Sequence, residues 1–181
     1  MRCRPPVALA ADAPAVVCVH GWGCSAYAYN RNLRALAERG LDAIAPDVRG
    51  HGWSDKPLDA SRYTPEALGR WLVALLDALA VPRAVLVGHS MGGAIAMRAA
   101  LRAPDRVPGL VLLAPVGFGH IPRTRLLRAV TPAWLDPVLP YVATRATIAI
   151  GLRTGYGTLG RPTARDVDEY WAPAADPDFV R

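Results

Sequence analysis

The residues best suited to chemistry lie in the segment Gly88-His89-Ser90-Met91-Gly92-Gly93. An apolar run, residues 83–87, precedes this segment, and an Ala-rich stretch that ends before Pro104 follows it. A Gly-x-Ser-x-Gly pattern between a strand and a helix forms a nucleophile elbow, a sharp turn that lifts the serine hydroxyl above the sheet. Glycines flank the serine because side chains at those positions would collide with the turn. Ser90 is therefore a candidate nucleophile, which needs a histidine to take its proton and an acid to orient that histidine.

Two other loops place histidine and glycine directly after apolar runs. His20-Gly21-Trp22-Gly23 ends a run that begins at Ala15, and Asp47-Val48-Arg49-Gly50-His51-Gly52 follows the run 41–46. Apolar runs that alternate with helical patterns predict parallel strands covered on both faces. The expected fold is α/β, a doubly wound and mostly parallel sheet whose site lies at the carboxyl ends of the strands. The expected strands are 15–20, 41–46, 83–87 and 109–114, and the expected helices are 27–39, 65–79 with Thr64 as its N-cap, and 94–103.

The pattern changes after Pro115. Prolines and bulky apolar residues are scattered over 119–149 without strand–helix alternation, and Thr163-Ala164-Arg165-Asp166 has the spacing of a helix capping box. We expect two parts, a core over residues 1–118 and a helical cap region over residues 119–181. The carboxylates of the second part, Asp166 and Asp168 among them, are interpreted as solvated residues of the cap.

Composition narrows the classes of partner. The formal charge of +6 comes from 20 arginines and one lysine, and these are scattered singly, so we expect no nucleic-acid partner. No apolar run reaches the roughly 20 residues that span a bilayer. Three cysteines (Cys3, Cys18 and Cys24) lack metal-ligand spacing, so a reduced, cytoplasmic setting and no metal are expected.

Taken together and in order, the His-Gly, Asp-x-Arg-Gly-His-Gly and Gly-x-Ser-x-Gly loops resemble those of the α/β-hydrolase superfamily, in its capped branch. The resemblance covers roughly residues 15–115. It implies that Ser90 is the nucleophile and that the backbone N–H groups of Trp22 and Met91 form the oxyanion hole. The residues that it implies shape the site around them are His20, Gly21, Gly88, His89 and Gly92.

The serine also narrows the chemistry. Relatives that open epoxides or remove halides are similar in the first two loops but place aspartate at the elbow. Ser90 instead implies acyl transfer on an ester, thioester, amide or related bond through an acyl-enzyme, with no cofactor. The apolar and aromatic content of the cap, such as Trp134, Tyr141 and Trp171, suggests a small apolar acyl substrate.

The base and the acid are harder to find. The family order is serine, acid, histidine, and Pro115–Gly119 offers no carboxylate. His20 and His51 are expected to shape the floor of the site, His89 to be structural, and His120 has no supporting pattern. We therefore expect the acid and the histidine beyond residue 181, the chain to be the amino-terminal part of a larger enzyme, and its outer strands to expose apolar edges.

Two alternatives stay open at this stage. The chain could be a catalytically inactive module that binds a ligand or a partner on the same scaffold. It could also be an acyltransferase or perhydrolase, which would share Ser90 and the oxyanion donors with a hydrolase. The activity of these 181 residues alone, the leaving group and the oligomeric state do not follow from the sequence.

Overall fold

The computed structural model describes the chain except for residues 7–9, 11–12, 118–138, 157, 159 and 177–181. The chain divides into two compact units, Met1–Gly117 and Phe118–Arg181, one residue before the boundary expected from the sequence. Each unit is described by itself.

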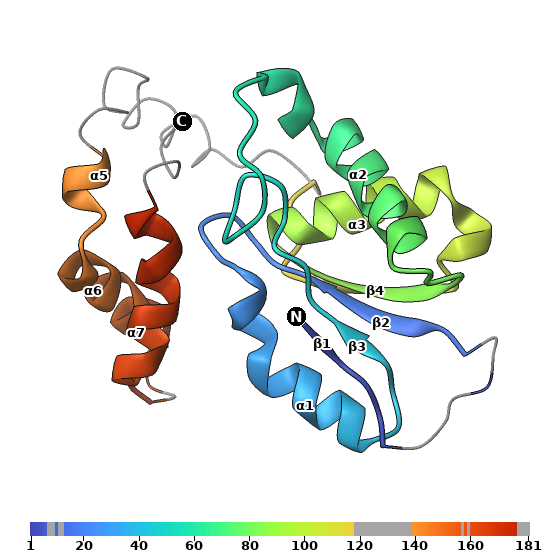
Figure 1. Ribbon diagram of the computed structural model, residues 1–181, viewed down its shortest axis with the longest axis horizontal. Coiled ribbons are helices and arrows are strands. Elements are labelled where there is room, and N and C mark those ends of the chain that lie inside the picture. Colours follow the sequence, from blue (N-terminus) through green and yellow to red (C-terminus); the bar gives the residue numbers. More distant parts are fainter. Residues whose placement is uncertain (7–9, 11–12, 118–138, 157, 159, 177–181) are drawn as a thin grey trace. The chain divides into compact units, whose positions relative to one another are not determined.

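The first unit is built on one five-stranded sheet of order β1-β3-β2-β4-β5 (Figure 1). Its strands are β1 (Arg2–Cys3), β2 (Ala15–Val19), β3 (Ala43–Ile44), β4 (Ala84–His89) and β5 (Gly109–Leu113). The β1 strand is antiparallel to β3, and every other pair of neighbours is parallel. The expected doubly wound, mostly parallel α/β sheet is thereby confirmed.

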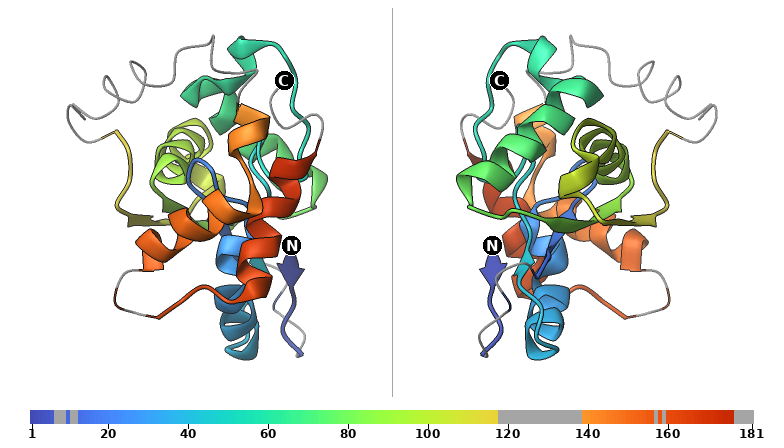
Figure 2. Two further views of the ribbon diagram at one scale, coloured as in Figure 1. Left: turned by 90° about the vertical axis from the view of Figure 1, so that its left-hand side faces the viewer. Right: turned by 90° about the vertical axis from the view of Figure 1, so that its right-hand side faces the viewer.

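Helices cover both faces of this sheet (Figure 2). Helix α1 (Asn30–Glu38), preceded by the 3-10 turn η1 (Ala26–Tyr29), lies on one face, whereas α2 (Pro65–Ala78) and α3 (Met91–Arg102) lie on the other. Two further 3-10 turns are η2 (Ala60–Tyr63) and η3 (Pro104–Arg106). The N-cap of α2 is Thr64, whose hydroxyl accepts a hydrogen bond from the Ala67 N–H at 3.2 Å, as its sequence position suggests.

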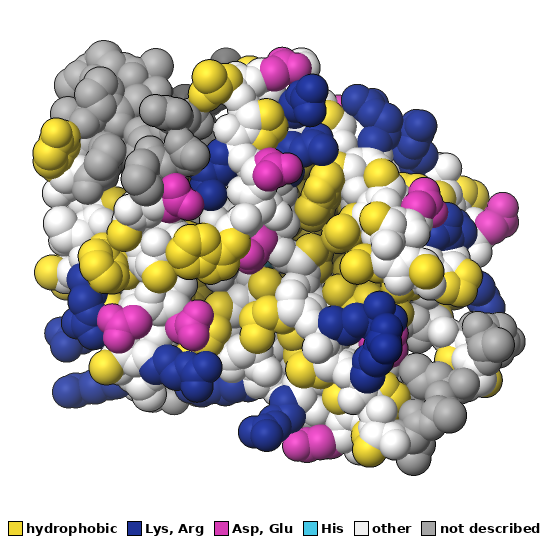
Figure 3. Space-filling view, in the orientation of Figure 1, with side chains coloured by type: hydrophobic (Ala, Val, Ile, Leu, Met, Phe, Trp, Pro, Cys, Tyr) yellow, Lys and Arg dark blue, Asp and Glu magenta, His cyan; other side chains and the backbone are white. Residues whose placement is uncertain are grey.

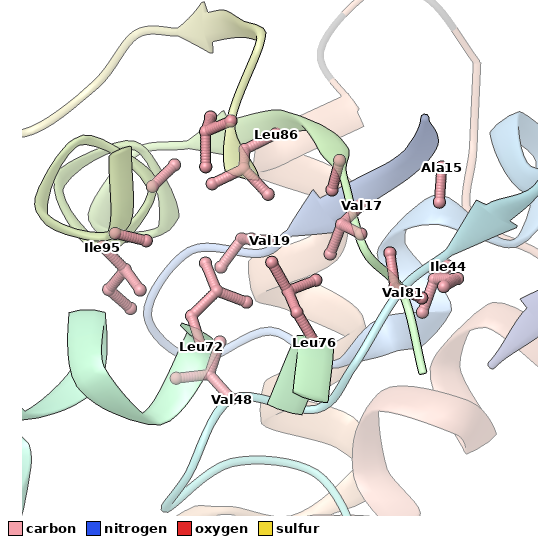
Figure 4. Close-up of a cluster of buried hydrophobic side chains, with 14 of the residues drawn as sticks. Ala15, Val17, Val19, Ile44, Val48, Leu72, Leu76, Val81, Leu86 and Ile95 are labelled. Carbon is pink, nitrogen blue, oxygen red and sulfur yellow. The ribbon is translucent and has the colours of Figure 1, made fainter. Parts of the chain in front are cut away.

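The alternation of side chains along β2 divides the core in two. Val17 and Val19 point to one face and pack against Leu72, Leu76 and Ile95 of the helices there (Figure 4). The intervening residues, such as Val16 and Cys18, join the cluster around Leu33 of α1 on the opposite face. Because successive side chains of a strand point to opposite faces, an uninterrupted apolar run fills both cores.

Two details of the sheet differ from expectation. The run 41–46 forms only the two-residue strand β3, although the Asp42 carbonyl next to it still accepts from the Val16 N–H of β2 at 2.8 Å. The antiparallel β1 was not among the expected strands. The last strand of the described sheet, β5, is half exposed, which agrees with the expectation that the outer strands expose apolar surface.

The described part of the second unit is helical. It contains α5 (Leu139–Val142), α6 (Arg145–Tyr156), α7 (Ala164–Trp171) and the 3-10 turn η5 (Ala172–Ala175). The capping box at Thr163 is present, with the Asp166 carboxylate accepting from the Thr163 N–H at 2.8 Å. The interpretation of Asp166 as solvated was wrong, because this cap buries it to 2% exposure. Asp168 is half exposed and pairs with Arg145 of α6 at 2.6 Å.

Charge and hydropathy add two observations. On the face in Figure 3, Lys and Arg side chains are dispersed, with Asp and Glu among them. None of the helices in the described ranges combines the length and apolar character that crossing a membrane requires.

Candidate functional site

Ser90 occupies a strained turn between β4 and α3. Its backbone has φ 52° and ψ −119°, a positive φ that is rare for a residue with a side chain. The turn is held from the side of β5, because the Ser90 N–H donates to Leu113 O and the Val116 N–H donates to Ser90 O, each at 3.0 Å. The elbow expected from the sequence is therefore present, with Ser90 at its apex.

Two glycines allow the close approaches that this turn needs. A methyl group at Gly88 would lie 2.6 Å from the Gly92 carbonyl oxygen. A methyl group at Gly92 would lie only 2.1 Å from the carbonyl oxygen of Val19 in the neighbouring strand. Both distances are shorter than non-bonded contacts permit, so helix α3 can begin here only because these side chains are absent.

The elbow brings the His-Gly loop against the serine. A methyl group at Gly21 would lie 3.2 Å from the Ser90 Cβ and 3.1 Å from the His89 Nδ1. The carboxyl ends of β2 and β4 are neighbours, with Val19 opposite Gly88 in the register. The parallel ladder therefore unites Gly21, His89 and Ser90, three residues that the sequence places in two separate loops.

The two oxyanion candidates are the sequence neighbours of Gly21 and Ser90, which lie close together. Met91 is the first residue of α3, so its N–H has no acceptor within the helix and stands at the positive end of the helix dipole. Trp22 follows Gly21 directly, and its indole is 71% exposed. The two loops therefore carry backbone donors beside the Ser90 turn.

His20 is fully engaged in the floor of the site. Its Nε2 accepts from the Val48 N–H at 2.9 Å, which leaves Nδ1 as the protonated nitrogen that donates to Gly21 O at 2.8 Å. Burial, the largest cause, lowers the pKa of His20 to about 4. The ring is thus uncharged and links the loops that follow β2 and β3 through its hydrogen bonds. Neither nitrogen is available to take a proton from serine.

The other histidines differ in their surroundings. His51 packs edge-on against His20, with ring centroids 5.5 Å apart, and burial lowers its pKa as well. His89 is exposed beside Gly21, and His120 lies outside the described residues. Among the described residues, no hydrogen bond joins the Ser90 hydroxyl to a histidine ring.

Asp47 organises the loop after β3 in a way that the sequence did not reveal. Its carboxylate accepts from the Ala26 N–H at 2.6 Å and from the Trp53 N–H at 3.0 Å. The Ser54 hydroxyl donates to the Asp47 carbonyl at 2.7 Å. A carboxylate two residues before an Arg-Gly-His-Gly run was the available signal, but only the fold shows that it ties this loop to η1.

Two further observations concern ligands. In the parts of the chain that the structure describes, no group of three or more His, Cys, Asp or Glu side chains is arranged to hold a metal ion. The second unit has an open cavity of about 450 Å³ lined by Arg153, Thr158, Gly160 and Arg161, which includes no residue of the elbow.

Comparison with known families gives one match. The family described as alpha/beta hydrolase fold matches residues 14–147, most of the chain. The matched segment includes the three loops described above and extends into the second unit.

Curated relatives differ in how much of the chain they share. An epoxide hydrolase of Caballeronia sordidicola is 50% identical over 93 residues, which are 51% of this chain and 28% of that protein. An uncharacterized protein of Mycobacterium tuberculosis is 38% identical over 183 residues, which cover 96% of this chain and 53% of that protein. An AB hydrolase superfamily protein of Bacillus subtilis, YfhM, is 28% identical and is covered to 59% of its length. The chain thus spans between about a quarter and three fifths of these relatives.

Solved structures give the same fold. An epoxide hydrolase without ligand, CorEH, has a TM-score of 0.78 at 22% identity, covering 99% of this chain and 64% of that one. Epoxide hydrolase A from Mycobacterium thermoresistibile has a TM-score of 0.72 at 26% identity, covering 93% and 65%. With the family match over residues 14–147, these likenesses show that the chain belongs to the α/β-hydrolase fold family.

Proposed function

We propose that this chain carries the nucleophile of a serine hydrolase that cleaves an ester, thioester, amide or related acyl bond. The observation that supports this most strongly is Ser90 at φ 52° on the turn between β4 and α3. A structure retains such strain at a serine where the turn serves a purpose, and here the turn raises the hydroxyl at the carboxyl ends of the strands.

In this proposal Ser90 attacks the acyl carbon and forms an acyl-enzyme that water then hydrolyses. The Trp22 and Met91 N–H groups donate to the oxygen that becomes negative in the tetrahedral intermediate. Loss of one such donor typically costs about 3–4 kcal/mol of transition-state stabilisation. Trp22 and Trp53 are 71% and 67% exposed on loops at this edge of the sheet, which favours an apolar acyl group.

The epoxide hydrolases among the relatives raise the alternative of epoxide opening. An aspartate that attacks an epoxide forms an ester, which water can cleave by addition to its carbonyl carbon. Attack by the Ser90 oxygen would form an ether, which has no carbonyl carbon for water to add to. The residue at the elbow therefore favours acyl substrates for this chain, and it is the residue in which such relatives are expected to differ.

Both ring nitrogens of His20 are bound to backbone groups, so His20 is not the general base in this proposal. The cytoplasm is the proposed compartment, since neither Cys3 nor Cys18 is in a disulfide.

A fluorophosphonate probe tests the proposal on the protein expressed from its complete reading frame. We expect covalent labelling of the wild type and of Ser61→Ala, a control that removes an exposed hydroxyl from η2. Ser90→Ala should not be labelled and should lose hydrolysis of short p-nitrophenyl esters. Equal labelling and equal ester hydrolysis by Ser90→Ala would refute the assignment and favour a module that only binds its ligand.

A further inference from the structure

The phenol of Tyr29 lies at the point where β2 ends and the His20–Trp22 loop begins. Tyr29 is the last residue of η1 and is 8% exposed. Its hydroxyl donates a hydrogen bond of 3.2 Å to the carbonyl oxygen of Val19, the last residue of β2. A buried phenol ordinarily has a polar partner, and here the partner is the carbonyl from which the candidate oxyanion loop departs.

Helix α3 also approaches this carbonyl closely at Gly92. A methyl group at Gly92 would lie 2.1 Å from Val19 O and 2.6 Å from His20 O. Gly92 follows Met91, the other candidate donor. The orientation of the Val19 peptide therefore influences both the path of the loop to Trp22 and the position at which the helix starting at Met91 packs on the sheet.

The hydroxyl stays a donor over the whole physiological range. Burial, the largest cause, raises the pKa of Tyr29 to about 12, and an interaction with the backbone of His89 acts in the opposite direction. His89 is the last residue of β4, so the phenol lies between the ends of the two strands that lead to Trp22 and Met91.

We propose that Tyr29 is a positioning residue for the oxyanion hole. By holding the Val19 carbonyl, its hydroxyl fixes the loop through His20 and Gly21, so that the Trp22 N–H points to the same oxygen as the Met91 N–H. The inference rests on the proposed function, because it assigns Tyr29 a part in the reaction of Ser90.

The test compares Tyr29→Phe with Tyr63→Phe in the protein expressed from its complete reading frame. Both substitutions remove one hydroxyl that donates to a backbone carbonyl, since Tyr63 donates to Pro57 O at 2.7 Å. We expect Tyr29→Phe to lower kcat on a p-nitrophenyl ester by about tenfold with little change in KM, because a misdirected donor weakens transition-state stabilisation. Tyr63→Phe should keep the wild-type kcat.

A thionoester substrate separates positioning from a loss of stability. Sulfur is a poor hydrogen-bond acceptor, so the ratio of ester to thionoester rates reports how well the oxyanion donors are used. We expect this ratio to fall in Tyr29→Phe and to stay at the wild-type value in Tyr63→Phe. A lower melting temperature with an unchanged ratio would overturn the proposal.

Amide hydrogen exchange decides the structural claim without turnover. The Trp22 amide should exchange faster in Tyr29→Phe than in the wild type, whereas unchanged exchange would overturn the inference. If Ser90→Ala keeps full ester hydrolysis, the proposed function fails and the role of Tyr29 in catalysis fails with it. If hydrolysis depends on Ser90 but Tyr29→Phe matches the wild type, the inference fails alone.

Discussion

At the scale of single residues, His20 shows how a side chain with catalytic potential can be committed to structure. An exposed imidazole near a serine would be a candidate base, but this ring is 1% exposed and both of its nitrogens bind backbone groups. Such a ring must stay neutral, because a proton on Nε2 would face the Val48 N–H. Protonating the buried ring is unfavourable, which lowers the pKa of His20 and makes the stability of the fold depend on pH.

We predict that the protein loses stability as the pH falls from 6.5 to 4. The folded-state pKa of His20 is about 4 against an ordinary 6.5, so in this window the unfolded chain takes up a proton that the folded chain excludes. The stability that neutral His20 contributes is fully present above pH 6.5 and is lost below pH 4. The difference is on the order of 3 kcal/mol. His51, whose pKa is also lowered, adds in the same sense. Urea unfolding at a series of pH values from 4 to 8 measures this effect. The free energy of unfolding should depend less steeply on pH in His20→Asn than in the wild type, and an equal dependence would contradict this account.

A second residue-scale prediction concerns Gly92. A methyl group there meets backbone atoms, Val19 O at 2.1 Å among them, and these cannot turn away as a side chain would. We expect Gly92→Ala to destabilise the fold by about 3 kcal/mol, at the upper end of overpacking costs. Gly151→Ala is the control, since its methyl group meets nothing within 4 Å in helix α6 and should add up to about 1 kcal/mol of stability. Thermal unfolding of both variants provides the comparison, in which Gly92→Ala should be the one that melts lower.

At the scale of elements, the sequence predicted the start of a helix wherever the two partners of the capping hydrogen bond lie close together in the sequence. The caps of α2 and α7 follow from Thr64 and Thr163, whose hydroxyls each accept from a backbone N–H three residues on. Strands gave less secure predictions, because their bounds depend on neighbours. The run 41–46 forms only the two-residue β3, and the side chain of Asp42 beside it binds Arg2, which is 40 residues away.

The cap of α7 should make a measurable contribution to the second unit. Thr163→Ala removes the hydroxyl that accepts from the Asp166 N–H at 3.1 Å and is expected to destabilise the unit by about 1 kcal/mol. Thr154→Ala, in the middle of α6, removes a hydroxyl that bonds only the Ile150 carbonyl and should be neutral or slightly stabilising. Hydrogen exchange of the α7 amides measures the effect. Faster exchange in Thr154→Ala than in Thr163→Ala would contradict the assignment.

At the scale of the whole molecule, β5 is where the first unit is incompletely covered. Leu110, Val111 and Leu113 are 39–46% exposed on the last strand of the described sheet. Side chains of successive residues point to opposite faces, so apolar surface is open on both sides of the strand. An apolar edge strand without charges invites pairing with another strand.

We therefore expect these 181 residues to self-associate with rising concentration through β5. Val111→Lys places a charge on this strand and should shift sedimentation towards the monomer. Leu58→Lys makes a comparable change at a loop residue that is 77% exposed, and it should leave self-association as in the wild type. Equal sedimentation of Val111→Lys and the wild type over the concentration series would exclude β5 as the contact.

Much of the fold and part of the candidate site could be predicted from the sequence. The strand–turn–helix around Ser90, the helices α2 and α3 and the parallel order all follow from apolar runs and glycine spacing. Three features could not be predicted from the sequence. They are the burial of His20, the hydrogen bonds by which the Asp47 carboxylate links two loops, and the hydrogen bond from the Tyr29 hydroxyl to the Val19 carbonyl. Each of these depends on partners that lie in another loop or strand, and local pattern does not contain such partners.

The sequence by itself determined the elbow, because its strain is local: Ser90 needs a positive φ, and Gly88 and Gly92 must lack side chains wherever such a turn is built. Only the tertiary structure decided what surrounds that turn. The parallel pairing of β2 and β4 brings Gly21 into contact with Ser90. Burial keeps the His20 ring uncharged. Burial and register depend on all the elements at once, so the surroundings of the serine emerge only when the sheet is assembled.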